Sequence, residues 1–345
     1  MITERFMIPG PKGRLQAILQ LPDGFDRTRD RCTVVILMHG IMPNPVTIPL
    51  PHFARALVNS GYAALRFFFY GNWGSDGTNE EVTVPGEIED ARAVYRLVRS
   101  WPFAEKVVLL GHSQGGVVAG MLAGQLACQF QQEAAPPDAT DGSQPSATES
   151  DGPLAPPDGQ PPLANSTPAS TSDTLAPPDG PQSAQADPAS ALAQPTEASS
   201  AADLPSTTLT PRPGRQAPTP PPDALILLSP GAVLKDYARE GRLFGLRVDP
   251  ENPPERKRVL WYTIGRDYIL TAQTLPIYET SSLYTGPVCI CHGTIDRIVP
   301  FRYSERYAAG YADARLHPIR GANHFYSFRR RRVDALLLAF LRARL

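Results

Sequence analysis

The segment Lys106-Val-Val-Leu-Leu110, continued by Gly111-His-Ser-Gln-Gly-Gly116, decides the fold of this 345-residue chain. The apolar run predicts a buried strand, and the apolar sequence that continues to about Phe130 predicts a helix. A Gly-x-Ser-x-Gly pattern between a strand and a helix is typical of a nucleophile elbow, a turn so sharp that small residues must flank the serine. We therefore expect the Ser113 hydroxyl to project above one edge of a sheet, in front of the positive end of a helix dipole.

Apolar runs and helical patterns alternate along the rest of the chain. The expected strands, after an extended lead-in around Arg14–Leu21, are Thr33–Met38, Tyr62–Tyr70, Ala224–Leu228, Pro287–Cys291 and Arg315–Ile319. The other expected helices are His52–Ser60, Gly86–Ser100 and Val333–Leu345. Strands that alternate with helices predict an α/β fold, in which a mostly parallel central sheet is covered by helices on both faces.

Ser113 needs a general base, and the base needs an acid to orient it, because a serine hydroxyl is a poor nucleophile at neutral pH. Behind such an elbow the acid and then the histidine follow the serine along the chain. Asp296 follows the strand that ends at Cys291, and His324 follows the strand that ends at Ile319. Since parallel strands present their carboxyl ends at one edge of a sheet, the sequence predicts a catalytic triad of Ser113, Asp296 and His324.

Two backbone N–H groups are expected to stabilise the oxyanion that forms when the serine attacks. One is that of Gln114, directly after the predicted nucleophile, and the other is that of Ile41, in the loop after Met38. We interpret the remaining histidines as structural; they are His39, His52, His112, His292 and His317.

Residues 131–222 differ in composition from everything around them. They contain 21 of the 38 prolines and 11 acidic residues, but only two basic residues and no aromatic residue, valine or isoleucine. Such a segment cannot form a core, so we predict a disordered Pro/Ala/Ser/Asp-rich insert at 131–223 within one domain made of 1–130 and 224–345. Ala-Pro-Pro-Asp recurs at 135–138, 155–158 and 176–179, which indicates a tandem expansion in a surface loop. A role as an interaction tether stays open.

Charge and cysteine content exclude several classes of function. The chain carries 33 basic against 34 acidic residues, which argues against a nucleic-acid binder. The four cysteines are too scattered for a disulfide framework, and no Cys/His spacing indicates a metal site, so no cofactor is expected. No apolar run reaches the ~18–20 residues of a membrane span, and the expected location is the cytoplasm. The expected partner is a small-molecule substrate, and the oligomeric state stays open.

Several motifs together resemble those of one enzyme family. They are His39-Gly40, Arg66-Phe67, Ser75-Asp-Gly77, Glu87-Ile-Glu-Asp90, Gly111-His-Ser-Gln-Gly-Gly-Val-Val118, Leu275-Pro-Ile-Tyr-Glu279 and His292-Gly-Thr with Asp296. In these motifs the sequence resembles the bacterial feruloyl (cinnamoyl) esterases of the α/β-hydrolase superfamily. The resemblance covers roughly 1–130 and 224–345. It implies hydrolysis of esters between hydroxycinnamic acids and alcohols or sugars, and a small cap formed by 231–285.

The resemblance also implies where a substrate would bind. Asp236 and Tyr268 stand at cap positions that meet the phenolic hydroxyl of the acyl group in that family, and Phe244 stands where a glutamine is usual. Because an aromatic ring cannot replace a polar contact, the aryl preference is open. The alternatives are a general carboxylesterase or a monoacylglycerol-type lipase with an aliphatic acyl pocket, a peptidase of the same fold, and a catalytically silent hydrolase fold that binds a ligand or partner.

Overall fold

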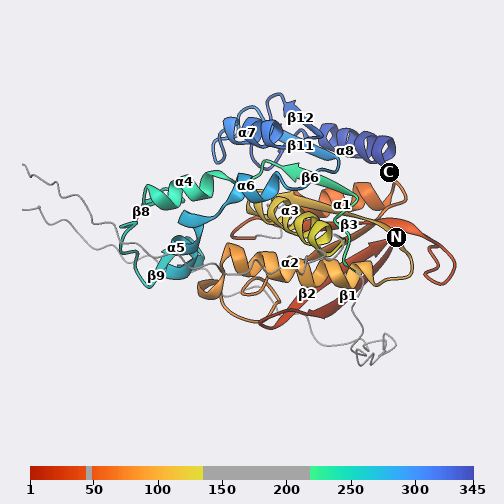
Figure 1. The fold of residues 1–345 in the computed structure, drawn as a ribbon, viewed down its shortest axis with the longest axis horizontal. Coiled ribbons are helices and arrows are strands. Elements are labelled where there is room, and N and C mark those ends of the chain that lie inside the picture. Colours follow the sequence, from red (N-terminus) through yellow and green to blue (C-terminus); the bar gives the residue numbers. More distant parts are fainter. Residues whose placement is uncertain (44–48, 135–217) are drawn as a thin grey trace, which may run out of the picture. The chain divides into compact units, whose positions relative to one another are not determined.

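One eight-stranded sheet, in the order β1-β2-β4-β3-β5-β6-β11-β12, organises the computed structural model, which describes residues 1–43, 49–134 and 218–345 (Figure 1). The strands are β1 (Ile2–Pro9), β2 (Arg14–Leu21), β3 (Cys32–Met38), β4 (Ala63–Phe67), β5 (Ala104–His112), β6 (Ala224–Leu228), β11 (Val288–Gly293) and β12 (Ala314–Ile319). The six from β4 to β12 in this order pair in parallel, whereas β2 pairs antiparallel with β4 and with β1. The mostly parallel sheet predicted from the sequence is confirmed.

The central strands contain continuous apolar runs because both faces of the sheet are covered. Every residue of β6 is buried, as are the last six residues of β5. The edge strand β12 is half exposed and contains Pro318, which lacks the N–H that a central strand needs for its ladder. The burial pattern therefore places the core where the sequence has its continuous apolar runs.

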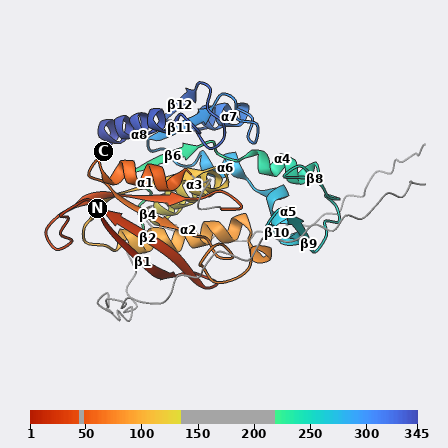
Figure 2. The ribbon, with the colours of Figure 1, turned by 180° about the vertical axis from the view of Figure 1, so that it is seen from behind.

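Alternate residues of the central strands pack against different helices. On one face Ile36 and Leu109 share a core with the helices α2 (Val84–Arg99) and α3 (Gln114–Ala134). On the other face Leu37 and Leu110 pack with α1 (Leu50–Val58) and α8 (Arg330–Arg344). Figure 1 shows α2 and α3 on the near side, and the view from behind in Figure 2 brings α1 forward. Within the described ranges, no helix has the length and apolar character needed to cross a membrane.

β1, α7 (Arg302–Gly310) and the short 3-10 helix η1 (Asn79–Glu81) were not expected from the sequence. β1 forms a hairpin with β2, and most of its residues are exposed or half-buried, so it carries no continuous apolar run. The helix α7 lies between β11 and β12 and buries only one side, through Tyr303, Ser304 and Tyr307. Polar, half-buried elements of this kind give a weak periodic signal in a single sequence.

Residues 231–285 form small elements outside the main sheet. They are α4 (Val233–Arg239), β7 (Arg242–Leu243), β8 (Leu246–Arg247), β9 (Arg256–Val259), β10 (Tyr262–Gly265), α5 (Arg266–Thr274) and α6 (Ile277–Ser281). β7 with β8 and β9 with β10 make two separate two-stranded sheets. This region, the cap, contacts the main domain closely, since a side chain at Gly265 would overlap the carbonyl oxygen of Glu80.

Both ends of the segment predicted as an insert belong to the folded domain. The helix α3 continues to Ala134. At the other end the carbonyl of Pro220 accepts a hydrogen bond from the Tyr95 hydroxyl at 2.8 Å, and the Asp223 carboxylate forms an ion pair with Arg99 at 3.0 Å. The insert predicted at 131–223 therefore begins too early and ends too late, and its remaining part, 135–217, lies outside the described residues.

Candidate active site

Ser113 sits in a strained turn between β5 and α3. Its φ is +57°, in the left-handed region that non-glycine residues seldom adopt. A side chain at Gly111 would overlap the carbonyl oxygen of Gly115, and one at Gly115 would overlap the carbonyl oxygens of Met38 and His39. The two glycines that flank the serine are therefore required by contact with backbone, as the elbow pattern predicts.

Backbone hydrogen bonds hold this turn in place. The N–H of Ser113 donates to the carbonyl of Leu228, at the end of β6, at 2.9 Å. The carbonyl of Ser113 accepts from the N–H groups of Gly116 at 2.9 Å and Gly231 at 2.8 Å. The loop after β3 passes so close that a Cβ built on Gly40 would lie 3.2 Å from Ser113 Oγ. The serine is thus fixed between the ends of three parallel strands.

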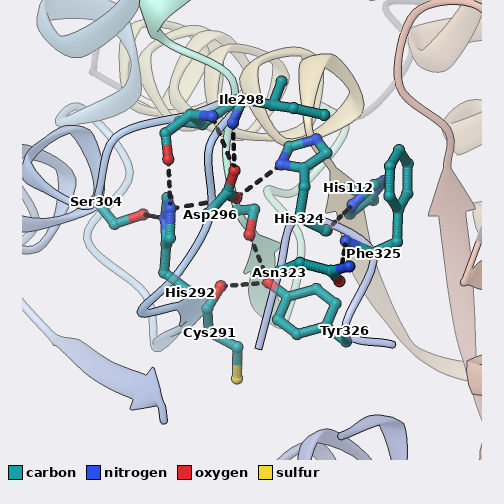
Figure 3. Close-up of polar contacts among 12 residues, drawn as sticks. His112, Cys291, His292, Asp296, Ile298, Ser304, Asn323, His324, Phe325 and Tyr326 are labelled. Carbon is teal, nitrogen blue, oxygen red and sulfur yellow. Dashed lines mark hydrogen bonds and ion pairs between the residues drawn. The ribbon is translucent and has the colours of Figure 1, made fainter. Parts of the chain in front are cut away.

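Asp296 and His324 meet at the same edge, in the loops after β11 and β12 (Figure 3). His324 Nδ1 lies 2.7 Å from Asp296 Oδ2, and the other carboxylate oxygen accepts hydrogen bonds from the N–H groups of Ile298 and Val299, each at 2.9 Å. Burial acts to raise the pKa of Asp296, but the hydrogen bond and charge of His324 and the two backbone amides outweigh it and hold the pKa below its usual value. Asp296 is therefore an ionised acceptor at neutral pH.

This contact determines which ring nitrogen of His324 carries the proton. An ionised carboxylate can only accept, so Nδ1 is the donor and Nε2 keeps its lone pair. The carbonyl of His324 accepts from His112 Nε2 at 2.9 Å, and the rings of these two histidines lie 4.9 Å apart. Since His112 is the residue before Ser113, the loop that carries the predicted base is tied to the elbow itself.

The hydroxyl of Ser113 makes no hydrogen bond to His324 or to any other group in the described part of the chain. The structure thus brings Asp296 and His324 into contact and anchors His324 beside the elbow, but the Ser113–His324 bond is not formed in it. Enzymes without substrate commonly hold this bond long and shorten it in the complex.

Tyr326 gives the His324 loop a second anchor, which the sequence analysis missed. Its hydroxyl is fully buried, donates to the carbonyl of Cys291 at 2.7 Å and lies 2.9 Å from Ser229 Oγ. The ring thereby ties the loop after β12 to β11 and to the end of β6. An aromatic residue two positions after a candidate histidine is a weak sequence signal, because its partners are distant in the chain.

Two of the other histidines have both ring nitrogens engaged in the core. His39 Nδ1 donates to the carbonyl of Gly40 at 2.8 Å and its Nε2 accepts from the Phe69 N–H at 3.2 Å; burial lowers the pKa of His39 to about 4. His292 Nδ1 lies 2.6 Å from Ser304 Oγ, and its Nε2 donates to the carbonyl of Val299 at 2.9 Å. These contacts fit the structural roles expected for both residues.

The two expected oxyanion donors lie together at a pocket beside Ser113. Gln114 is the first residue of α3, so its N–H has no acceptor within the helix. The N–H of Ile41 makes no hydrogen bond to the described residues. Both residues line the same pocket as Ser113. The arrangement can offer two N–H groups to an oxygen that becomes negative next to the serine.

The pocket has a volume of about 550 Å³ and lies between the elbow and the cap. Its other lining residues are Gly231, Val233, Leu234, Tyr237, Ala238, Arg242, Phe244, Gly245, Leu246, Arg247, Tyr268, Arg297, Ile298 and Val299. Tyr268 and Phe244, two of the three expected contact residues, thus face the pocket. Within the described residues, no group of three or more His, Cys, Asp or Glu side chains could hold a metal ion.

Asp236, the third expected contact residue, is not among the residues that line the pocket. Its Oδ2 accepts a hydrogen bond of 2.6 Å from the Tyr303 hydroxyl on α7. On α4 the neighbours Leu234 and Tyr237 line the pocket instead. Position in a motif could not reveal which side of this short helix faces the pocket.

A buried hydrogen-bond chain that the sequence analysis missed lies behind the pocket. The Tyr268 hydroxyl donates to Gln114 Oε1 at 2.6 Å, and Gln114 Nε2 donates to Glu87 Oε2 at 2.7 Å. The one signal in the sequence is the position of Glu87, four residues before Ala91 on the apolar side of its helix. Its partners lie 27 and 181 residues away in the chain, beyond any local pattern.

Comparison with solved structures identifies the fold. The chain is similar to Est1E from Butyrivibrio proteoclasticus with ferulic acid bound, with 21% identity over 98% of each chain and a TM-score of 0.67. It is also similar to the esterase domain of a Rhodothermus marinus protein, with 14% identity over 99% of each chain and a TM-score of 0.54. XC6422 from Xanthomonas campestris, an α/β serine hydrolase without a lid, shares 15% identity over 99% of this chain and 94% of its own, with a TM-score of 0.51.

No protein-family model matches the sequence, and no curated protein matches it significantly. At these identities the likeness to solved structures concerns the fold, which is that of the α/β hydrolases.

Proposed function

We propose that this protein of α/β-hydrolase fold is a serine esterase that hydrolyses carboxylic esters through an acyl-enzyme. The observation that carries the proposal is the 2.7 Å contact between Asp296 and His324, which in the neutral imidazole puts the proton on Nδ1 and the lone pair on Nε2. It lies at the strand edge where Ser113 stands in its strained turn. Acyl transfer needs a nucleophile, a base with a free lone pair and a buried acid that orients the base. Ser113, His324 and Asp296 are the proposed three.

In the proposed acylation step, Ser113 Oγ attacks the ester carbonyl carbon while His324 Nε2 takes the hydroxyl proton. Asp296 stabilises the imidazolium that forms. The backbone N–H groups of Gln114 and Ile41 hold the negative oxygen of the tetrahedral intermediate. His324 then gives its proton to the leaving alkoxide oxygen, so the alcohol departs and the acyl group stays on Ser113.

Deacylation repeats the sequence with water as the nucleophile. His324 Nε2 removes a proton from the water, whose oxygen attacks the acyl carbon, and the same two N–H groups hold the oxyanion. Collapse of this intermediate returns the proton to Ser113 Oγ and releases the carboxylic acid. The enzyme ends in its starting state, with Asp296 ionised throughout.

Hydroxycinnamoyl esters are the first candidate substrates. Sequence motifs support this, as does the fold likeness to Est1E, whose solved structure holds ferulic acid. The Tyr268 hydroxyl donates to Gln114 but keeps its lone pairs, so it can accept a hydrogen bond from a phenolic hydroxyl in the pocket.

Esters of aliphatic acids are the second candidate. The wall that α4 and the loop after β11 contribute is largely apolar, and Phe244 adds a ring that is 40% exposed. Of the two polar cap groups expected to meet a phenol, Tyr268 lines the pocket, whereas Asp236 Oδ2 accepts a hydrogen bond from Tyr303.

A pair of substrates and a covalent probe test the proposal. The kcat/KM values for methyl ferulate and p-nitrophenyl butyrate decide between the two acyl classes. A fluorophosphonate probe is expected to label Ser113, with the site mapped by mass spectrometry of the peptides. Absence of labelling together with absence of hydrolysis of both esters would favour the catalytically silent binding protein instead.

A further inference from the structure

Glu87, Gln114 and Tyr268 come from three helices that are distant in the chain and meet behind the pocket. Glu87 lies in α2, Gln114 opens α3, and Tyr268 lies in α5 of the cap. All three side chains are buried, with exposed fractions of 2%, 2% and 3%. The Gln114 carboxamide is held on both sides, by Glu87 Oε2 at 2.7 Å and by the Tyr268 hydroxyl at 2.6 Å. One side chain thus couples the main domain to the cap.

The surroundings of Glu87 favour its neutral form. Its Oε1 is buried and has no hydrogen-bond partner among the described residues, and none of the charged groups that affect it is a cation. The titratable groups that face it are Asp90 on its own helix and the hydroxyls of Tyr268 and Tyr262 from the cap. Burial raises the pKa of Glu87 to about 8. A neutral carboxyl still accepts the Gln114 hydrogen bond through its carbonyl oxygen.

Gln114 is the residue whose backbone N–H is proposed to hold the oxyanion. That N–H belongs to the same peptide group as the Ser113 carbonyl, which the N–H groups of Gly116 and Gly231 already fix. The two side-chain hydrogen bonds add a second constraint, because they leave the Gln114 side chain one orientation in a packed interior. A donor that stabilises a transition state must be held in its final geometry beforehand.

We propose that Glu87 is a positioning residue for the esterase reaction: its carboxyl group holds the Gln114 side chain, and thereby keeps the Gln114 N–H directed at the oxyanion. Tyr268 extends the same constraint to the cap. The neutral form matters because a carboxylate at this depth would place a second negative charge near the oxygen that becomes negative in the transition state. This inference rests on the function proposed above.

Three variants on α2 test it with p-nitrophenyl butyrate as substrate. Glu87→Leu removes the acceptor and is expected to lower kcat about tenfold, less than the ~10²–10³ for complete loss of an oxyanion donor. Glu87→Gln restores a neutral acceptor and is expected to recover most of that loss. Glu89→Gln is the matched control, since Glu89 lies on the same helix with its side chain 55% exposed. A kcat of Glu87→Leu within twofold of wild type would overturn the proposal.

The pH dependence of kcat separates a positioning role of Glu87 from a merely structural one, because a structural role would leave the pH dependence unchanged. In the wild type we expect kcat to fall as the pH rises through about 8, where Glu87 ionises. In Glu87→Gln, which keeps the shape of the side chain, this fall is expected to disappear. If the wild type and Glu87→Gln lose kcat together above pH 8, Glu87 does not act as proposed. This comparison does not use Glu87→Leu, so it tests the proposal even if that variant does not fold.

Ser113→Ala separates failure of this inference from failure of the proposed function. If Ser113→Ala hydrolyses the ester at the wild-type rate, the esterase mechanism itself is wrong. If Ser113→Ala is inactive while Glu87→Leu and Glu87→Gln both behave as wild type at every pH, the mechanism stands and the positioning role is wrong.

Discussion

Asp296 and His324 are joined by a 2.7 Å contact that fixes the proton on His324 Nδ1. The acid is itself held by two backbone N–H groups, so its second oxygen cannot turn away from them. The orientation of the imidazole thus rests on loops after two neighbouring parallel strands, β11 and β12.

We expect Asp296→Asn to lower kcat by about 10⁴, because a carboxamide neither enforces this tautomer nor stabilises the imidazolium. The melting temperature should change little, because the asparagine oxygen can still accept from the amides of Ile298 and Val299. Steady-state kinetics and thermal melts on the same preparation check both statements. A kcat close to that of wild type would mean that His324 is not the base.

Gly40→Ala tests how closely the loop after β3 approaches the nucleophile. The added Cβ would lie 2.8 Å from the Cβ of Ser113 and 3.2 Å from its Oγ, so the serine or the loop must move. A displacement of about 1 Å at a reacting group can cost up to ~10² in rate. Gly310→Ala is the control, because the nearest atom to its added Cβ is 4.0 Å away. Equal activity of the two variants would contradict the described geometry.

Asp236 is expected to matter for stability rather than for substrate choice. Asp236→Asn weakens the hydrogen bond from Tyr303, with a cost of about 1 kcal/mol in the free energy of unfolding. The ratio of kcat/KM between methyl ferulate and p-nitrophenyl butyrate should stay unchanged, whereas Tyr268→Phe should change it. A change of that kcat/KM ratio in Asp236→Asn but not in Tyr268→Phe would show that Asp236 contacts the substrate.

Glu87 is expected to make a contribution to stability that is lost as the pH rises from about 4.5 to about 8. Its pKa is raised from 4.5 in the unfolded chain to about 8 in the fold, so the unfolded chain releases this proton first and gains from higher pH. This loss is absent below pH 4.5, where Glu87 is neutral in both states. Glu87→Gln should therefore raise the melting temperature relative to wild type at pH 8 but not at pH 4. The same difference in melting temperature between the two proteins at pH 4 and at pH 8 would contradict the raised pKa of Glu87.

The sequence predicts the centre of this fold better than its edges. β3, β5 and β6 each contain a continuous apolar run because both faces of the sheet are covered there, and that signal is local. β1 and α7 are half exposed, and their partners rather than their own residues decide their structure.

The candidate site likewise contains residues that the sequence predicts and contacts that it does not. Ser113 and Asp296 each follow an apolar strand, and His324 follows the half-exposed edge strand β12, so strand order alone indicates one common edge. The side that a cap residue faces depends on packing between distant segments, so the sequence could not show that Tyr268 lines the pocket and that Asp236 bonds Tyr303. The contacts of Glu87 with Gln114 and of Tyr326 with Cys291 join residues that are distant in the chain, so they depend on the finished fold.

Acylation of Ser113 is the central claim, and a quenched reaction of the purified protein with p-nitrophenyl butyrate tests it most directly. We expect mass spectrometry to find a butyryl group on the peptide that contains Ser113, and Ser113→Ala to lower kcat by roughly 10⁴–10⁶ with an unchanged fold. Undiminished hydrolysis by Ser113→Ala, with no acyl group on that peptide, would contradict the account.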